Sequence, residues 1–111
     1  MAFNVLADQV KLSNINKLSA HYLEEKSAFC YSQESLSQYL DAAKNSNIQS
    51  MNQLVLAGKC DFVPDGQVYQ VGKYDNAKIG GTPIIAFNKD DTTLWTFKAF
   101  VNSVNFDVAM P

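Results

Sequence analysis

The apolar positions between residues 32 and 44 repeat at the spacing of an α-helix. Four of them fall at positions i, i+3, i+4 and i+7 of one helical face: Leu36, Tyr39, Leu40 and Ala43. Ser32 is a favoured N-cap residue, and Glu34 puts a carboxylate in the first turn, where the helix dipole favours negative charge. The pattern predicts a helix that begins after Ser32 and ends near Lys44.

Two further helices are predicted, one on each side of this segment. Before it, Asn14 is a possible N-cap for an amphipathic helix over residues 14–28, whose apolar positions are Ile15, Leu18, Tyr22 and Leu23. After it, Asn47 can cap a short helix that Gly58 ends, with the apolar residues Ile48, Met51, Leu54 and Val55. Residues 1–12 alternate weakly between apolar and polar, which fits either a strand or a loose arm.

From residue 60 onward the pattern changes to short runs rich in β-branched and aromatic residues, separated by turn residues. These runs predict strands over residues 67–74, 84–87, 92–97 and 100–108. In the turn predicted at Val63–Gly66, proline takes the second position and glycine the fourth. The other predicted breaks are a turn at Asp75–Asn76, a bend at Gly80–Gly81 and a four-residue hairpin connection at Asn88–Asp91.

Helices followed by turn-separated strands predict an α+β fold, with N-terminal helices packed on a small antiparallel sheet or a partly open barrel. The chain has 111 residues and shows neither a repeat nor a linker, so we expect a single domain over residues 1–111. Its helical half would cover about 14–58 and its strand half about 60–108. No stretch approaches the roughly 18 uninterrupted apolar residues that span a bilayer, so we expect no membrane insertion.

The only two cysteines, Cys30 and Cys60, each lie at the edge of a predicted element. This favours one disulfide, which would close a loop of about 30 residues and join the helical half to the first strand. Because a disulfide needs an oxidising compartment, this interpretation predicts a periplasmic or secreted protein. The alternative is a pair of buried thiols in a cytosolic protein. The first eight residues do not fit a signal peptide, so the periplasmic interpretation requires a leader that has been removed.

The charged residues disfavour nucleic acid and membrane surfaces as partners. The basic residues are nine scattered lysines with no arginine, and the net charge is −2, whereas nucleic-acid binding uses a basic stripe. An anionic membrane surface likewise attracts clustered basic residues. Two cysteines and one histidine without close spacing do not match a zinc site, and no phosphate-loop motif is present. We therefore expect no metal and no cofactor.

The candidate catalytic groups have plainer structural explanations. On the predicted helix over 14–28, His21 would face away from Cys30, and a disulfide would remove the thiol. The neighbouring acids Glu24 and Glu25 would diverge on the same helix. Asp90 and Asp91 fall in a predicted turn, where aspartate is common. We expect these acids to be solvated and expect no catalytic residue.

Aromatic residues concentrate in the strand half, and some of them are candidates for binding. If Tyr69, Tyr74 and Trp95 share the outer face of the sheet, they would form a patch for a peptide or a glycan, because aromatic side chains are enriched at binding hot spots. The alternative is that Trp95 and Phe97, which share a face of their strand, fill the core.

The second half also resembles a known family. In order, it presents the Pro64-Asp65-Gly66 turn, a strand with Val68 and Val71, a glycine-containing bend, an acidic hairpin and Leu94-Trp95-Thr96. In this order, residues 60–108 resemble the small Src-homology-3-like barrels of bacterial envelope proteins. The resemblance implies a barrel in which a tryptophan, here Trp95, closes a late hairpin.

Taken together, these features predict a non-catalytic protein-binding module of the bacterial envelope, either an inhibitor or immunity protein or a small subunit of an assembly. Its partner would be another protein, such as an envelope protein or a toxin. Two alternatives stay open. One is a small hydrolase that uses His21 with a carboxylate, and the other is a cytosolic phage-type regulator if the two thiols are free.

Overall fold

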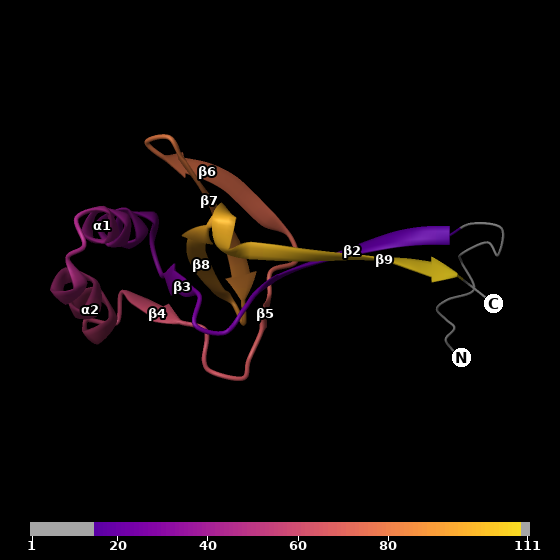
Figure 1. Cartoon of the computed structure of the whole chain (residues 1–111), viewed down its shortest axis with the longest axis horizontal. Helices are drawn as coiled ribbons and strands as arrows, with labels where there is room; N and C mark the ends of the chain where they lie inside the picture. Colours follow the sequence, from indigo (N-terminus) through magenta and orange to yellow (C-terminus); the bar gives the residue numbers. More distant parts are fainter. Residues whose placement is uncertain (1–14, 110–111) are drawn as a thin grey trace.

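The structure, a computed structural model, describes the backbone of residues 15–109 and the side chains of residues 20–103. It is an α+β fold with two helices and two antiparallel sheets, of three and five strands (Figure 1). Residues 1–12, predicted as a strand or an arm, lie outside the described residues. The elements in chain order are β2 Ile15–Leu23, β3 Ala28–Cys30, α1 Gln33–Lys44, α2 Ile48–Leu56, β4 Cys60–Phe62, β5 Tyr69–Gln70, β6 Tyr74–Ile79, β7 Thr82–Lys89, β8 Thr92–Phe97, the 3-10 turn η1 Lys98–Phe100 and β9 Val101–Ala109.

The five-stranded sheet has the order β4-β3-β8-β7-β6. Its hairpins are tight: Gly80 (φ +60°) lies in the β6–β7 turn, and Asp90 and Asp91 (φ +50° and +66°) form the β7–β8 turn. Positive φ at both central residues is the type I′ geometry that matches the twist of paired strands. The β7–β8 connection is therefore two residues long and not four, because Asn88 and Lys89 still pair with β8.

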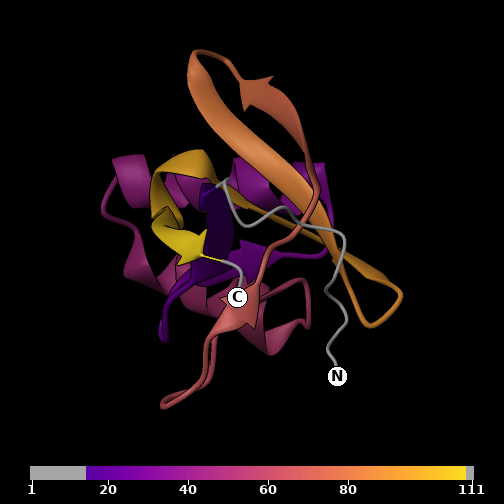
Figure 2. The same cartoon turned by 90° about the vertical axis from the view of Figure 1, so that its right-hand side faces the viewer.

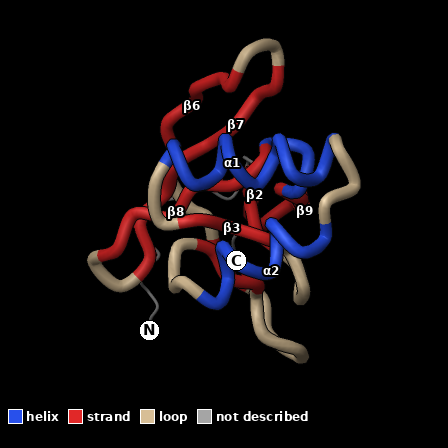
Figure 3. Tube along the Cα trace, turned by 90° about the vertical axis from the view of Figure 1, so that its left-hand side faces the viewer, coloured by secondary structure: helices blue, strands red, loops and turns tan. Residues whose placement is uncertain are grey.

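Both faces of this sheet are buried, and each carries its own hydrophobic core. Alternation along β7 sends Ile84 to one side and Ile85 to the other, and both are fully buried. The helix-side core consists of Ala28, Cys30, Leu36, Tyr39, Cys60, Ile84 and Phe97. The ribbon-side core consists of Leu23, Phe29, Val63, Val71, Ile85, Phe87 and Leu94. In Figure 3, viewed from the helical end, α1 and α2 lie in front of the sheet.

The helix predicted over 32–44 is confirmed as α1. The hydroxyl of Ser32 accepts a hydrogen bond from the backbone N–H of Ser35 (3.0 Å), as an N-cap does. Leu36 and Tyr39 are buried as expected, but Ala42 is buried in place of Ala43. The helix therefore lies on the sheet rotated by about one residue from the predicted face.

The short helix predicted after Asn47 is confirmed as α2. The side-chain oxygen of Asn47 accepts a hydrogen bond from the N–H of Ser50 (3.1 Å), and Gly58 follows the helix at φ +74°. None of the residues of α2 is fully buried, because the helix contacts α1 and β4 along one side only. Ile48 and Leu56 are exposed to 68% and 85%.

The helix predicted over residues 14–28 is wrong. The segment forms β2, a turn around Lys26 (φ +69°) and β3, so within the described residues two strands precede α1. The spacing of Ile15, Leu18 and Tyr22 fits one side of a helix, but all nine residues of β2 pair with β9. A partner some 80 residues away in the chain thus overrides the local pattern.

The turns around residues 63–76 also differ from the prediction. The hydrogen bond of the first turn runs from Gln67 N–H to the Pro64 carbonyl (3.1 Å), so the turn is shifted by one residue and Gly66 takes its third position at φ +77°. The strand predicted over 67–74 is reduced to β5. Asp75 and Asn76 do not turn: they lie in β6, paired with β7.

The predicted strand over 100–108 is confirmed as β9, and its pairing with β2 creates the most distinctive feature of the shape. The two strands pair from Leu23 and Val101 to Ile15 and Ala109. They form a two-stranded ribbon that projects from the body on the side away from the helices, in a molecule of 54 × 27 × 22 Å (Figure 1). The two sheets are not closed into a barrel within the described residues, so the arrangement is that of helices packed on an open antiparallel sheet.

Two leucines at opposite extremes of burial test the helix-side core. Leu36 is fully buried and Leu56 is 85% exposed. Leu36→Ala is expected to lower the free energy of unfolding by about 2–5 kcal/mol, because it removes buried apolar surface and leaves a cavity. Leu56→Ala, the matched control, is expected to change it by less than about 0.5 kcal/mol. Urea denaturation measures both, and equal effects would contradict the placement of α1.

Candidate functional site

Both cysteines of the chain are joined in the predicted disulfide. Cys30 and Cys60 are register partners on the neighbouring strands β3 and β4, with an S–S distance of 2.09 Å. Both residues are almost completely buried, and the Sγ of Cys60 lies 3.9 Å from the carbonyl oxygen of Ser35 in α1. The bond closes the segment that contains both helices. No thiol is left to act as a nucleophile.

The three aromatic residues proposed as one binding patch lie on opposite faces of the molecule. Trp95 pairs with Ala86 and Cys30 and packs against the helix-side core. Tyr69 and Tyr74 pack against the ribbon-side core instead. All three are partly exposed, but only the two tyrosines pack against the same core.

Tyr69 belongs to a cluster that the sequence indicated only in part. Its ring lies 5.7 Å from that of buried Phe29, and Tyr31 meets Phe29 edge-on at the same separation. The ammonium of Lys89 lies 4.4 Å from the centre of the Tyr69 ring, a cation–π contact. Tyr31, 43% exposed, was missed by sequence reasoning, although it continues the strand after Cys30.

The electrostatics of this cluster follow from its neighbours. Partial burial raises the pKa of Tyr31, and the charges of Asp61 and Tyr69 add to that rise. The hydrogen bond from Lys89 to Asp90 (2.9 Å) raises the pKa of Lys89, so the cation above Tyr69 is held in its charged form.

His21 lies on a strand and not on a helix, at the point where the ribbon joins the body. Its ring is 5.6 Å from that of Tyr74, in an edge-on arrangement. The two side chains line a small cavity of about 200 Å³ together with Ile85, Lys98, Val101 and Ser103.

The described lining of the His21 cavity contains no carboxylate to support general acid–base catalysis. Two of the acids considered from the sequence make contacts outside this cavity. Glu25 accepts a hydrogen bond from the N–H of Gly66 (2.6 Å), and Asp90 pairs with Lys89 in the β7–β8 turn. The arrangement that a hydrolase with His21 and a carboxylate requires is therefore not assembled among the described residues.

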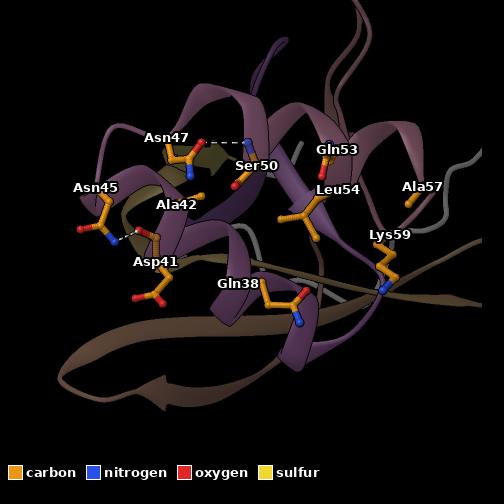
Figure 4. Close-up of a pocket in the computed structure, with 10 residues that line it drawn as sticks. All are labelled: Gln38, Asp41, Ala42, Asn45, Asn47, Ser50, Gln53, Leu54, Ala57 and Lys59. Atoms are coloured by element: carbon orange, nitrogen blue, oxygen red, sulfur yellow. Dashed lines mark hydrogen bonds between the residues drawn. The ribbon is translucent and has the colours of Figure 1, made fainter.

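A polar groove of about 470 Å³ runs between the two helices (Figure 4). Two of its amides are used to end or begin helices: Asn45 donates to the carbonyl of Asp41 (2.9 Å), and Asn47 accepts from Ser50. Figure 4 shows Asp41 and Lys59 at opposite ends, so they do not form an acid–base pair. The groove results from the pairing of the helices, and its lining carries no set of groups suited to catalysis.

The ribbon offers backbone groups rather than side chains. Among the described strands β9 is the last of its sheet, and β2 pairs with β5 only at Tyr22 and Leu23. One more bond, from the N–H of Val71 to the carbonyl of His21 (2.9 Å), closes the root of the ribbon. Beyond that point, no other strand in the described part of the chain lies beside either edge.

The described residues contain neither a metal-binding cluster nor a membrane-spanning helix. No three or more histidine, cysteine, aspartate or glutamate side chains gather there in a way that could hold a metal ion. None of the helices found there has the length and apolarity needed to cross a membrane.

Comparison of the chain with protein-family models, curated proteins and solved structures finds no match. The resemblance of residues 60–108 to Src-homology-3-like barrels therefore stays a prediction.

The disulfide is expected to contribute strongly to stability. Replacing both cysteines, Cys30→Ala with Cys60→Ala, should lower the free energy of unfolding by about 3–4 kcal/mol, because the open chain gains conformational freedom in the unfolded state. Urea denaturation with and without a reductant measures the same loss in the original chain. The double variant is the control, since a reductant should not affect it. An unfolding midpoint that ignores the reductant in the original chain would contradict the prediction.

Proposed function

We propose that this protein is a non-catalytic protein-binding module that works outside the cytoplasm, in the bacterial envelope, as an inhibitor or immunity protein or as a small subunit of an assembly. The observation that carries the proposal is the projecting β2–β9 ribbon, beside whose edges no described strand lies beyond the short pairing with β5.

The edges of the ribbon are suited to an extended segment of another protein. An edge strand presents a row of backbone N–H and C=O groups with no partner in its own sheet. A polypeptide that lies alongside satisfies these groups by adding a strand, and its alternate side chains then contact the neighbouring surface. On the β5 side of the ribbon, residues 15–20 of β2 lie beyond the bond between Val71 and His21 and offer a length close to the roughly five or six residues of an average strand.

The tyrosines lie where they can supplement such backbone pairing. Tyr69 pairs with Leu23, at the end of β2 where the ribbon meets the body. A segment that pairs with the free part of β2 and continues toward the body would reach β5 with Tyr69, and then Tyr31; both tyrosines flank buried Phe29. Rigid aromatic side chains of this kind commonly dominate binding energy. Trp95 lies on the opposite face and has no part in this surface.

The disulfide supports the proposed location. The bond closes a 30-residue segment, and both of its cysteines are buried. Such a disulfide forms and persists in an oxidising compartment, such as a periplasm or the cell exterior. The alternative of a cytosolic regulator required free thiols, whereas both cysteines are bonded to each other.

Position-specific photo-crosslinking tests the binding surface. A photo-reactive amino acid replaces Ala20 on β2, or Gln49 on the exposed side of α2 as the control, and the protein is irradiated in an envelope extract of its source cells. We expect a discrete adduct from position 20 only, with the cross-link mapping to an extended segment of the partner. Adding Tyr69→Ala should reduce its yield about tenfold, the usual effect of losing one aromatic hot spot. Equal adducts from both positions, or none, would contradict the proposal.

Alkylation of the protein in its source cells tests the compartment separately. Cells are treated with a membrane-permeant thiol reagent before lysis, and the mass of the purified chain is measured without reductant. We expect no added mass, because the disulfide blocks both sulfurs. After the purified chain has been reduced and treated with the reagent again, we expect both cysteines to be modified. Modification of both cysteines by the reagent without any reduction step would place the protein in a reducing compartment.

A further inference from the structure

Four hydrogen-bond donors from different parts of the chain meet at the root of the ribbon. The cavity of about 200 Å³ is lined by His21, Tyr74, Lys98 and Ser103, of which Lys98 and Ser103 are also exposed to solvent. Its remaining lining residues, Ile85 and Val101, are apolar. In Figure 2 the ribbon points toward the viewer, so this root lies behind its tip, against the body.

The fold fixes each of these donors through backbone pairing or core packing. His21 on β2 is the register partner of Ser103 on β9, and its carbonyl is also held by Val71. Tyr74 is the first residue of β6 and is paired with Phe87 of the ribbon-side core. Lys98 begins η1, which is held against the sheet because Phe100 packs edge-on against buried Phe97 at 5.3 Å. The convergence is therefore a product of the sheet, not of a loose loop.

The described lining of the cavity includes a positively charged side chain and no negatively charged one. All four polar side chains can donate a hydrogen bond, and Lys98 carries a full positive charge. Among the described residues that line the cavity there is no aspartate or glutamate to neutralise it. Asp75 follows Tyr74 in the chain, but it pairs with Ala86, and alternation along β6 directs it to the other face of the sheet.

These donors are also not engaged with one another or with other described side chains. The side-chain hydrogen bonds of the described residues involve helix caps, turns and the buried pair of Thr96 with Ala28, but none of His21, Tyr74, Lys98 or Ser103. An anion that enters the cavity would therefore meet the charge of Lys98 and three further side chains able to donate to it, beside the apolar residues Ile85 and Val101.

We propose that this cavity binds the oxyanion group of a small ligand, a carboxylate or a phosphate. Its volume of about 200 Å³ is below the roughly 300–1,000 Å³ of pockets that enclose a drug-sized molecule. It therefore suits a single anionic group with at most a short aliphatic part, which would contact Ile85 and Val101. This site is distinct from the strand edges of the ribbon, and its ligand does not depend on the proposed protein partner.

Titration of the intact protein with inorganic phosphate and with propionate tests the site, at constant pH and with chloride keeping the ionic strength constant. Chemical shifts of the backbone amides at positions 21, 74, 98 and 103 are followed by ¹H–¹⁵N NMR. We expect saturable shifts that centre on these residues with at least one of the two anions. Tighter binding of propionate identifies a carboxylate ligand, and tighter binding of phosphate identifies a phosphorylated one.

Two lysine variants distinguish a specific site from general attraction. Lys98→Gln should weaken binding about tenfold or more, since it removes a charged donor that contacts the anion. Lys78→Gln removes the same charge from an exposed position on β6 and should change the affinity by less than about twofold. Ser103→Ala, which leaves the charge unchanged, should weaken binding about fivefold. Equal weakening by the two lysine variants, or shifts that do not saturate with either anion, would overturn the proposal.

Discussion

The covalent bond between Cys30 and Cys60 closes the 30-residue segment that holds both helices, at the point where that segment leaves and re-enters the five-stranded sheet. Cys30 also pairs with Trp95 of β8, so one short strand connects the disulfide to the hairpins of the sheet. This anchor matters most for α2, which buries no residue completely and makes most of its contacts with α1 and β4. Stability and the proposed oxidising compartment therefore rest on the same bond.

The sheet separates the molecule into two sides with different capacities. On one side the helices cover the core, and some amides of the groove between them serve as helix caps. On the other side the ribbon leaves the body: the partly exposed tyrosines and the cavity lined by His21 lie near its root, and the strand edges without a described partner begin beyond it. Both proposed binding activities thus arise where a second sheet meets the first one.

The candidate site shows how far side-chain chemistry can be predicted before the register is known. The sequence identified Tyr69, Tyr74 and Trp95 as aromatic residues on strands, and all three are partly exposed. Which face each one occupies depends on the parity of its position within a paired strand, and a shift of one residue exchanges the faces. The turn placed at Asp75–Asn76 and the helix placed over His21 hid the fact that Tyr74 and His21 are neighbours.

Local interactions allowed the sequence by itself to determine α1 and α2 with their caps at Ser32 and Asn47, and the strand over 92–97. The order of these elements gave the α+β class, and the presence of two cysteines alone gave the disulfide. A helix closes its hydrogen bonds within four residues, and a cap within three, so neighbouring residues contain the necessary information. Only the tertiary structure decided that residues 15–23 form a strand, because their partner is residues 101–109 at the other end of the chain. Strand pairing is non-local, and so the ribbon and the cavity at its root exist only once the two ends of the fold have met.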